Sequence, residues 1–298
     1  MGTRAVVLGG GGPVGIAWES GLISGLAKGG VDFGQADFIM GTSAGSFVGA
    51  RLAMGEPASA LVEPFLKMQA GAAPERHAGA AKTRAPADMS KLATLMAEAQ
   101  SGQRPAEEVR RELGAWALAA ETVGEQAFIE SFGSAFSSLP DDYWPERPYA
   151  CTAVDTASGE FQLWTKESGV GLVRAVASSC SVPGVYPPVT IGGKRYMDGG
   201  MRASTNADMA TGYDLVVLVS VRLSAEDTPM AQRLRQTTER EIAVLKDGGA
   251  EVVVISPDAT SAAAMGVNLM DFRQRRPAAE AGLAQGEAEA ARLAVAWG

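Results

Sequence analysis

The sequence predicts an α/β fold, a three-layer sandwich with a largely parallel central sheet. Short apolar runs at residues 4–9 and 37–40 each lead into a glycine and are followed by a segment with helical spacing of apolar residues. Two later runs, 215–221 and 251–256, consist almost entirely of Val, Leu and Ile, which is typical of central strands covered on both faces. Strands that alternate with helices favour a parallel sheet between helical layers.

The remaining elements follow from the same signals. Helices are expected where apolar residues keep helical spacing, and they should end at glycine or proline. They are expected at residues 14–28, 43–54, 172–177 and 230–246, and from Pro277 to the C-terminus. The runs 149–155 and 160–165 flank a turn and predict a hairpin. Two adjacent prolines in 183–188 predict an extended, irregular segment.

We interpret residues 1–298 as a single domain with a helical, cap-like insert at about residues 57–140, where alanine, glycine and polar residues dominate. The insert is either a lid over a site or an ordinary helical layer. Its apolar residues either line an acyl-chain channel or form core packing. They are Phe65, Leu66, Met68, Leu92, Leu95, Met96, Phe128 and Phe132.

Composition excludes several function classes. A net charge of −8 argues against a nucleic-acid partner, which requires a basic surface. Cys151 and Cys180 are too few for a disulfide framework and fit no zinc spacing, so we expect reduced thiols and no metal site. The sequence opens directly into a predicted strand, and no run reaches the roughly 18 apolar residues of a membrane span. We therefore expect a cytoplasmic protein, peripheral to membranes at most.

A glycine loop at residues 10–15 follows the first predicted strand and opens a helix. Its sequence, Gly-Gly-Gly-Pro-Val-Gly, matches the dinucleotide-binding pattern, and Asp37 stands roughly where a ribose-binding acid is expected. The same backbone N–H groups at a helix N-terminus suit the oxyanion of acyl transfer. A tight turn without a ligand is the third interpretation, and the loop alone does not choose among them.

Ser43 lies in Gly41-Thr-Ser-Ala-Gly45, the G-x-S-x-G pattern of a nucleophile elbow between a strand and a helix. The small residues Gly41 and Gly45 are what such a strained turn needs. A serine that merely caps the helix is the alternative interpretation.

A Ser-His-Asp triad needs a histidine, and the chain has one, His77, in a polar Ala- and Gly-rich stretch typical of a loop. Asp198, followed by Gly199 and Gly200, offers a carboxylate as the base instead. An Asx turn would explain the same residues without catalysis. Three other acids could serve as the base instead but lack the two glycines that allow close backbone approach: Asp155, Asp208 and Asp214.

The order of glycine loop, G-x-S-x-G and Asp-Gly-Gly resembles the patatin-like phospholipase family. Residues 177–188, Ala-Ser-Ser-Cys-Ser-Val-Pro-Gly-Val-Tyr-Pro-Pro, are similar to the segment that precedes the family's Asp-Gly-Gly or Asp-Gly-Ala. Asn206, which follows Asp198 along the chain, is a further similarity to the family. The resemblance spans about residues 4–220. One position departs from the family, because Val14 stands where Arg or Lys usually precedes the last glycine, a change that bears on catalytic strength and on anionic head-group preference.

The resemblance implies a patatin-like fold and a serine acyl hydrolase of lipid esters. Ser43 would be the nucleophile and Asp198 its base, without a cofactor. The N–H groups of Gly10, Gly11 and Gly12 would form the oxyanion hole, supported by Gly15, Gly41, Gly45, Gly199 and Gly200. The partner would be a lipid or another acyl ester, reached through transient membrane contact. A non-catalytic lipid-binding relative and a nucleotide-dependent enzyme remain the rival hypotheses.

Overall fold

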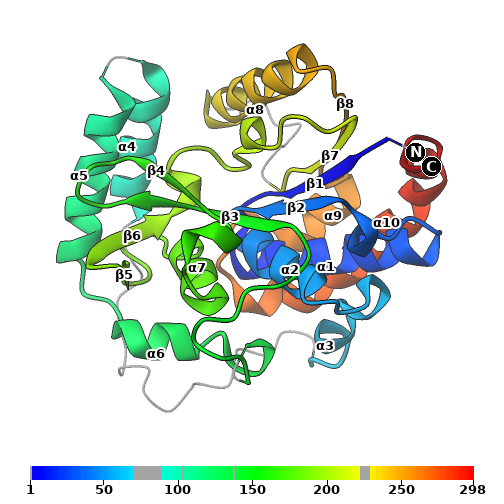
Figure 1. The fold of residues 1–298 in the computed structure, drawn as a ribbon, viewed down its shortest axis with the longest axis horizontal. Coiled ribbons are helices and arrows are strands. Elements are labelled where there is room, and N and C mark those ends of the chain that lie inside the picture. Colours follow the sequence, from blue (N-terminus) through cyan, green and yellow to red (C-terminus); the bar gives the residue numbers. More distant parts are fainter. Residues whose placement is uncertain (1, 70–88, 103, 137, 222–228) are drawn as a thin grey trace. The chain divides into compact units, whose positions relative to one another are not determined.

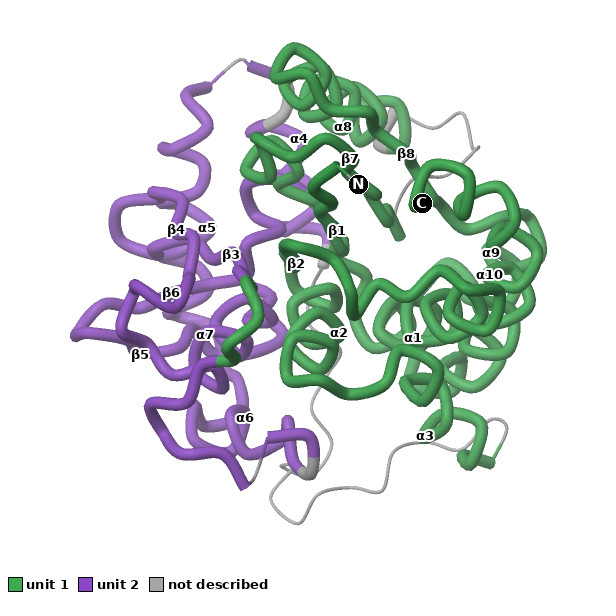
Figure 2. Tube along the Cα trace, turned by 45° about the vertical axis from the view of Figure 1, so that its right-hand side comes forward, with its two compact units in different colours: residues 1–74, 145–149, 204–298 green, residues 75–144, 150–203 purple. Residues whose placement is uncertain are grey.

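A computed structural model of the protein describes residues 2–69, 89–102, 104–136, 138–221 and 229–298. The chain divides into two compact units, each assembled from segments far apart in sequence (Figure 2). The first unit comprises residues 1–74, 145–149 and 204–298, and the second comprises residues 75–144 and 150–203. His77 lies outside the described residues.

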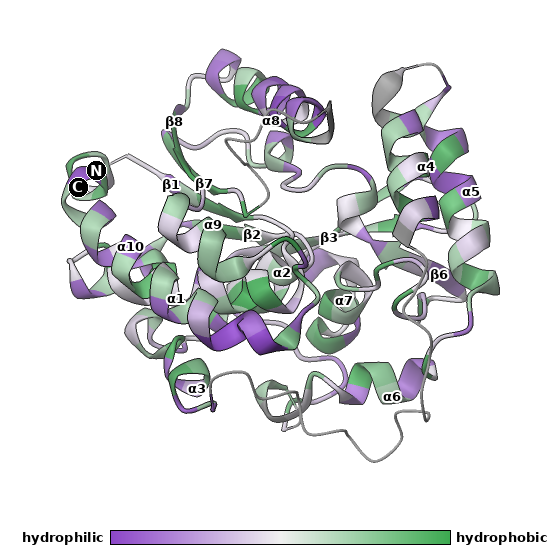
Figure 3. Cartoon of the chain, turned by 180° about the vertical axis from the view of Figure 1, so that it is seen from behind, coloured by the Kyte–Doolittle hydropathy of each residue, from purple (hydrophilic) through white to green (hydrophobic). Residues whose placement is uncertain are grey.

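The first unit contains four parallel strands in the order β2-β1-β7-β8 (Figure 1). They are β1 (Arg4–Leu8), β2 (Phe38–Gly41), β7 (Leu215–Val219) and β8 (Glu251–Ile255). All five residues of β7 are buried and hydrophobic, and β8 is hydrophobic after its first residue, Glu251 (Figure 3). The prediction of a largely parallel sheet is confirmed here.

Helices cover both faces of this parallel sheet. On one face lie α1 (Gly12–Lys28), α2 (Ala44–Ala53), α9 (Ala259–Met265) and α10 (Arg275–Trp297), and on the other lies α8 (Pro229–Asp247) (Figures 1 and 3). A short helix, α3 (Glu63–Leu66), follows α2 along the chain. The three layers predicted from the alternation of strands and helices are thus present in the first unit.

Glycines let α1 and α10 approach each other closely. A Cβ added to Gly21 would lie 2.2 Å from the carbonyl oxygen of Ala279, and one on Gly25 would lie 2.3 Å from that of Leu283. Gly282 has the same relation to α1, since its Cβ would lie 2.3 Å from the Trp18 carbonyl oxygen. No side chain fits at these positions, so α10 packs its backbone directly on α1, the helix that follows the glycine loop.

The second unit contains an antiparallel group of strands. It consists of β3 (Tyr149–Asp155, whose first residue belongs to the first unit), β4 (Phe161–Trp164), β5 (Val189–Ile191) and β6 (Lys194–Asp198). β3 pairs with both β4 and β6, and β5 pairs with β6. The predicted hairpin of β3 and β4 is confirmed. Four helices complete the unit: α4 (Met89–Ser101), α5 (Ala106–Ala119), α6 (Glu125–Glu130) and α7 (Leu172–Ser179).

The helices α4 and α5 of the predicted insert share a core with the strands of the second unit. Leu92 and Leu95 of α4 form one cluster with Val109 and Leu113 of α5 and with Val154 and Met197 of the strands. Phe128 of α6 belongs to a second cluster with Ala177 and Val189. Of the two interpretations of the insert's apolar residues, core packing therefore applies to Leu92, Leu95 and Phe128.

Three details differ from the sequence predictions. β8 is the outer strand of the parallel order and its valines are only partly buried, so its apolar run does not mark a central strand. Helix α9 was not predicted, because its seven residues are mostly alanine and lack apolar periodicity. Helix α1 begins at Gly12 rather than at residue 14, with Pro13 in its first turn, where a missing N–H costs nothing. Among the described helices, none is long and apolar enough to span a bilayer.

Candidate active site

The glycine loop leaves the carboxyl end of β1. The neighbours of β1 are β2, reached through α1, and β7 on its other side, so the strand order reverses at β1. In open α/β sheets, ligands bind outside the carboxyl ends of the strands at such a reversal. The first two predicted site segments, the glycine loop and the elbow at Ser43, follow β1 and β2 and so lie at this end.

Hydrogen bonds fix the glycine loop but leave two of its amides available. The Gly10 N–H donates to the Ser204 carbonyl oxygen at 2.8 Å, and the Val14 N–H donates to the Leu269 carbonyl oxygen at 3.2 Å. The N–H groups of Gly11 and Gly12 have no hydrogen-bond partner among the described residues. Because Gly10 would have to release Ser204 to bind an anion, we centre the candidate oxyanion hole on Gly11 and Gly12.

Ser43 sits in a strained backbone conformation between β2 and α2. Its φ of +52° and ψ of −117° are rare for a residue with a side chain. Its side chain makes no capping hydrogen bond to α2, so the helix-cap interpretation does not apply. A strained, non-capping serine directly before a helix N-terminus is the geometry of a nucleophile elbow.

The flanking glycines are required by close backbone packing. A Cβ on Gly41 would lie 2.3 Å from the Gly45 carbonyl oxygen, and a Cβ on Gly45 would lie 2.2 Å from the Leu8 carbonyl oxygen. The Gly45 N–H also donates to the Gly9 carbonyl oxygen at 3.0 Å. The elbow is thus pressed against the end of β1, directly before the glycine loop.

This packing brings Ser43 beside the glycine loop. A Cβ built on Gly10 would lie 3.3 Å from the Ser43 Cβ, so any side chain at residue 10 would crowd the serine. Gly15, in the first turn of α1, lies close to the start of α2, because a Cβ built on it would be 3.5 Å from the Ala44 Cβ. Ser43, the candidate nucleophile, and the candidate oxyanion donors therefore share one corner of the first unit.

Asn206 holds the residue that precedes Ser43. Its side-chain amide donates to the Thr42 hydroxyl at 3.1 Å, and that hydroxyl donates to the Thr205 carbonyl oxygen at 3.3 Å. Asn206 is fully buried and has a left-handed φ of +52°. The sequence singled out Asn206 only through the family resemblance. Its link to Thr42 depends on a contact between residues 164 positions apart, which no local pattern reveals.

Asp198 ends β6 in the second unit and is buried. Its Oδ1 accepts a hydrogen bond from the Gly200 N–H at 2.7 Å, and its own N–H donates to the Ser181 carbonyl oxygen at 3.0 Å. A Cβ on Gly199 would lie 2.1 Å from the Thr152 Oγ1. The Asx turn of the alternative interpretation is therefore present, and it fixes one of the two carboxylate oxygens of Asp198.

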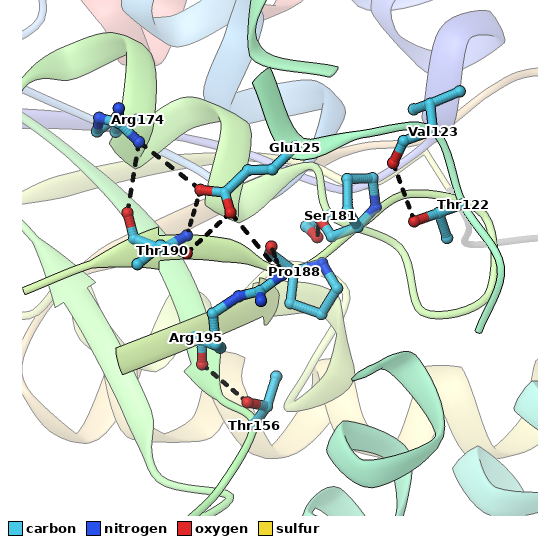
Figure 4. A network of polar contacts seen from close by, with 10 residues as sticks. Thr122, Val123, Glu125, Thr156, Arg174, Ser181, Pro188, Thr190 and Arg195 are labelled. Atoms are coloured by element: carbon cyan, nitrogen blue, oxygen red, sulfur yellow. Dashed lines mark hydrogen bonds and ion pairs between the residues drawn. The ribbon is translucent and has the colours of Figure 1, made fainter. Parts of the chain in front are cut away.

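A polar network fixes the segment that leads to β6 (Figure 4). Glu125, the first residue of α6, accepts hydrogen bonds from the Thr190 N–H at 2.7 Å and from its hydroxyl at 2.8 Å. Arg174 and Arg195 lie 3.7 and 3.8 Å from the same carboxylate. The Ser181 hydroxyl donates to the Pro187 carbonyl oxygen. Ser181 therefore bonds both to Pro187, near the end of the irregular 183–188 segment, and to the backbone of Asp198.

Two of the three rival acids have structural roles. Asp155 accepts hydrogen bonds from the Ala157 and Ser158 N–H groups and pairs with Lys194, and Asp214 accepts hydrogen bonds from Thr3. Burial raises the pKa of Asp155, but the two N–H groups and Lys194 outweigh it and bring the pKa below its ordinary value. Asp208 is half-buried in the first unit.

Two further observations bear on the glycine loop. Asp37 precedes β2 and accepts a hydrogen bond from the Arg4 N–H at 2.7 Å, so it lies at the amino ends of the strands, opposite the loop. It cannot bind a ribose whose phosphates occupy the loop. Val14, the departure from the family pattern, is fully buried. No group of three or more metal-ligating side chains suited to hold a metal occurs in the described part of the chain.

A model of the patatin-like phospholipase family matches residues 6–211, which is more than half of the chain. The chain belongs to the patatin-like phospholipase family. Both the strained Ser43 and the Asp198 turn fall within the matched range, and the carbonyl of Leu269, which holds Val14, falls outside it. The family resemblance expected from the three motifs is thereby confirmed.

Solved structures similar to this patatin-like protein include VipD from Legionella pneumophila, with 14% identity and a TM-score of 0.46 over 96% of this chain and 66% of that one. The type III effector protein ExoU matches with 16% identity and a TM-score of 0.35 over 96% of this chain and 53% of that one. The chain thus spans less than two thirds of the length of each. Among curated proteins, none matches the chain.

Proposed function

We propose that the protein is a serine acyl hydrolase that cleaves carboxylic esters of lipids, of the phospholipase or lysophospholipase type. The observation that carries the proposal is the strained Ser43 beside a glycine loop whose Gly11 and Gly12 N–H groups have no partner among the described residues. Membership of the patatin-like family supports a lipid ester as the substrate class.

In this mechanism the Ser43 Oγ attacks the ester carbonyl carbon and its proton passes to the Asp198 carboxylate. The Gly11 and Gly12 N–H groups stabilise the negative carbonyl oxygen of the tetrahedral intermediate. The intermediate collapses to an acyl-serine, and Asp198 returns the proton to the leaving alcohol. Water then attacks the acyl-serine by the same route, giving the carboxylic acid and free Ser43.

The glycine loop must supply much of the rate enhancement. A carboxylate with an ordinary pKa of about 3.9 is a weak base for an alcohol. Stabilisation of the oxyanion has to compensate for this, and losing a single donor of an oxyanion hole typically costs about 10²- to 10³-fold in turnover. The Asx turn orients the Asp198 carboxylate, because the Gly200 N–H holds its Oδ1. In the proposed mechanism the other oxygen, Oδ2, accepts the proton of Ser43.

Hydrolysis of p-nitrophenyl esters by matched variants tests the proposal. Ser43→Ala and Asp198→Asn should each lose at least about 10³-fold in kcat, as removal of a nucleophile or its base does in serine hydrolases. Asp208→Asn, a carboxylate of the first unit that has no role in the mechanism, is the control and should keep wild-type turnover. A fluorophosphonate should label the wild type and not Ser43→Ala.

The rival hypotheses give other outcomes. Equal rates in the wild type, Ser43→Ala and Asp198→Asn would leave a non-catalytic lipid-binding relative. A rise in melting temperature with a nicotinamide or adenine nucleotide, without labelling of Ser43, would indicate a nucleotide enzyme, which the position of Asp37 disfavours. Because long-chain esters reside in bilayers, the proposal includes transient contact of a cytoplasmic protein with a membrane surface.

A further inference from the structure

Glu241 is a buried glutamate on the packed face of α8. In the part of this helix whose burial the structure describes, the buried residues recur at helical spacing and are Ala231, Thr238, Glu241 and Leu245. An apolar side chain is expected at position 241, because a carboxyl group loses its hydration when it is buried. A glutamate that is only 5% exposed therefore needs a polar partner within the fold.

Thr205 is a polar partner of this glutamate. The Thr205 hydroxyl donates a hydrogen bond to the Glu241 Oε2, and both side chains are buried. The methyl branch of Thr205 faces the end of β1, since a Cβ built on Gly9 would lie 3.2 Å from the Thr205 Cγ2. Because a β-branched side chain has few χ1 rotamers, these two contacts fix Thr205 between α8 and the residue that precedes the glycine loop.

The chain on either side of Thr205 holds both loops of the candidate site. The Ser204 carbonyl oxygen accepts a hydrogen bond from the Gly10 N–H at 2.8 Å. The Thr205 carbonyl oxygen accepts one from the Thr42 hydroxyl at 3.3 Å, and that hydroxyl accepts one from the Asn206 side-chain amide at 3.1 Å. Three consecutive residues thus bond to the glycine loop and to the residue that precedes the candidate nucleophile.

Glu241 connects these three residues to the helical layer on the other face of the sheet. The glycine loop leads into α1 and the elbow leads into α2, and both helices lie on one face, whereas α8 lies on the other (Figure 1). α8 packs against β8 and against the short 3₁₀ helix Ala207–Met209, which directly follows Asn206. The hydrogen bond between Glu241 and Thr205 therefore anchors the residues that hold the two loops to α8.

We infer that Glu241 is a positioning residue of the candidate active site, which keeps the glycine loop and the elbow in register by holding Thr205. The inference rests on the proposed function for its catalytic part, and it assigns Glu241 no contact with the substrate. The Gly11 and Gly12 amides stabilise an oxyanion only where attack by Ser43 creates it, so a shift of one loop against the other lowers turnover. A misplacement of about 1 Å, caused by a mutation away from the chemistry, can cost about 10²-fold in rate.

The first test compares two variants in the hydrolysis of p-nitrophenyl esters. Glu241→Met has a side chain of similar length without an acceptor and should lower kcat by about 10- to 100-fold, with KM within about threefold of the wild type. Glu241→Gln keeps an oxygen that accepts from the Thr205 hydroxyl and should keep kcat within about threefold. Glu239→Met, at an exposed position of α8, is the control and should match the wild type. Wild-type kcat in Glu241→Met, or an equal loss in Glu241→Gln, overturns the inference.

A double variant separates positioning from stability. Thr205→Val removes the hydroxyl and keeps a methyl branch toward Gly9, and together with Glu241→Met it replaces both hydrogen-bonding groups by apolar groups of similar shape. Because neither partner is then left buried without the other, the unfolding constant in urea should stay within about tenfold of the wild type. The kcat of the double variant should still be at least about tenfold lower. A kcat that recovers together with stability would leave Glu241 a purely structural role and overturn the inference.

Amide hydrogen exchange of the same double variant is independent of catalysis, so it separates a failure of this inference from a failure of the proposed function. Peptides that contain residues 5–15 and 40–48 should exchange up to about tenfold faster than in the wild type, because the hydrogen bonds that hold the two loops open more often. A peptide of residues 280–292 in α10 should keep its wild-type rate. Unchanged exchange of both loop peptides overturns the inference, even if the protein proves to be a hydrolase. Faster exchange of both in a protein without esterase activity supports positioning by Glu241 and rejects the proposed function.

Discussion

The two candidate catalytic residues are held in different ways. Ser43 has a φ of +52°, whereas Asp198 has an ordinary φ of −48°. The glycines around Ser43 are enclosed by backbone atoms that cannot move away. At Asp198 only Gly199 is enclosed by a neighbouring strand, while Gly200 would meet the Asp198 side chain itself. Backbone strain is thus concentrated at the nucleophile, and the acid is oriented by a hydrogen bond in an otherwise relaxed turn.

The largest expected effect comes from Gly45→Ala. The added Cβ would lie 2.2 Å from the Leu8 carbonyl oxygen, so β1 and α2 would have to separate. We expect a loss of more than about 4 kcal/mol in the free energy of unfolding, beyond the range of ordinary substitutions. Urea unfolding measures it, with Ala53→Gly in the last turn of the same helix as control. A loss below about 1 kcal/mol would mean that the elbow is not closely packed.

Gly200→Ala should separate stability from activity in the relaxed turn. Its Cβ would lie 2.9 Å from the Asp198 Oδ1 and near no backbone atom of another segment. We expect a stability cost of about 1 kcal/mol, typical of point mutations, together with a fall in kcat of at least about tenfold because the carboxylate is displaced. Wild-type kcat in this variant would show that the orientation of Asp198 does not depend on Gly200.

Asn206 holds Thr42, the residue before the strained Ser43, and can be tested with a matched pair of variants. Asn206→Gly keeps the left-handed backbone and removes the hydrogen bond to Thr42, while Asn206→Ala also introduces strain. We expect losses of about 1 to 3 kcal/mol for the glycine variant, from the unsatisfied buried group, and about 1 kcal/mol more for alanine. Thermal or urea unfolding would show equal losses if the conformation of Asn206 carried no strain.

The smallest expected effect is a difference in stability between two variants of Ser43. Ser43→Gly should be more stable than Ser43→Ala by about 1 kcal/mol, because glycine adopts a positive φ without strain. Both variants lack the hydroxyl, so the comparison isolates the backbone. If their unfolding midpoints coincide, the strain at Ser43 is smaller than its φ suggests.

Local patterns predicted the strands of the parallel unit and most of its helices, α9 excepted, and the residues of both turns. Apolar runs and glycine punctuation located β1, β2 and β7 and placed Ser43 after a strand, as found, but they did not locate β6, which ends at Asp198. They could not show that β8 is an edge strand or that Ser204 occupies the Gly10 N–H. Both facts depend on which segments become neighbours in space, and residue spacing does not record this.

The sequence by itself determined the residues of the candidate site: a serine between small residues, an aspartate before two glycines, and a loop able to present backbone amides. These depend on side-chain size and local backbone freedom, which are properties of a few adjacent residues. Only the tertiary structure decided which amides of the glycine loop remain without a partner among the described residues, and that Asn206 holds Thr42. Burial and long-range hydrogen bonds arise when distant segments pack, so they exist only in the folded chain.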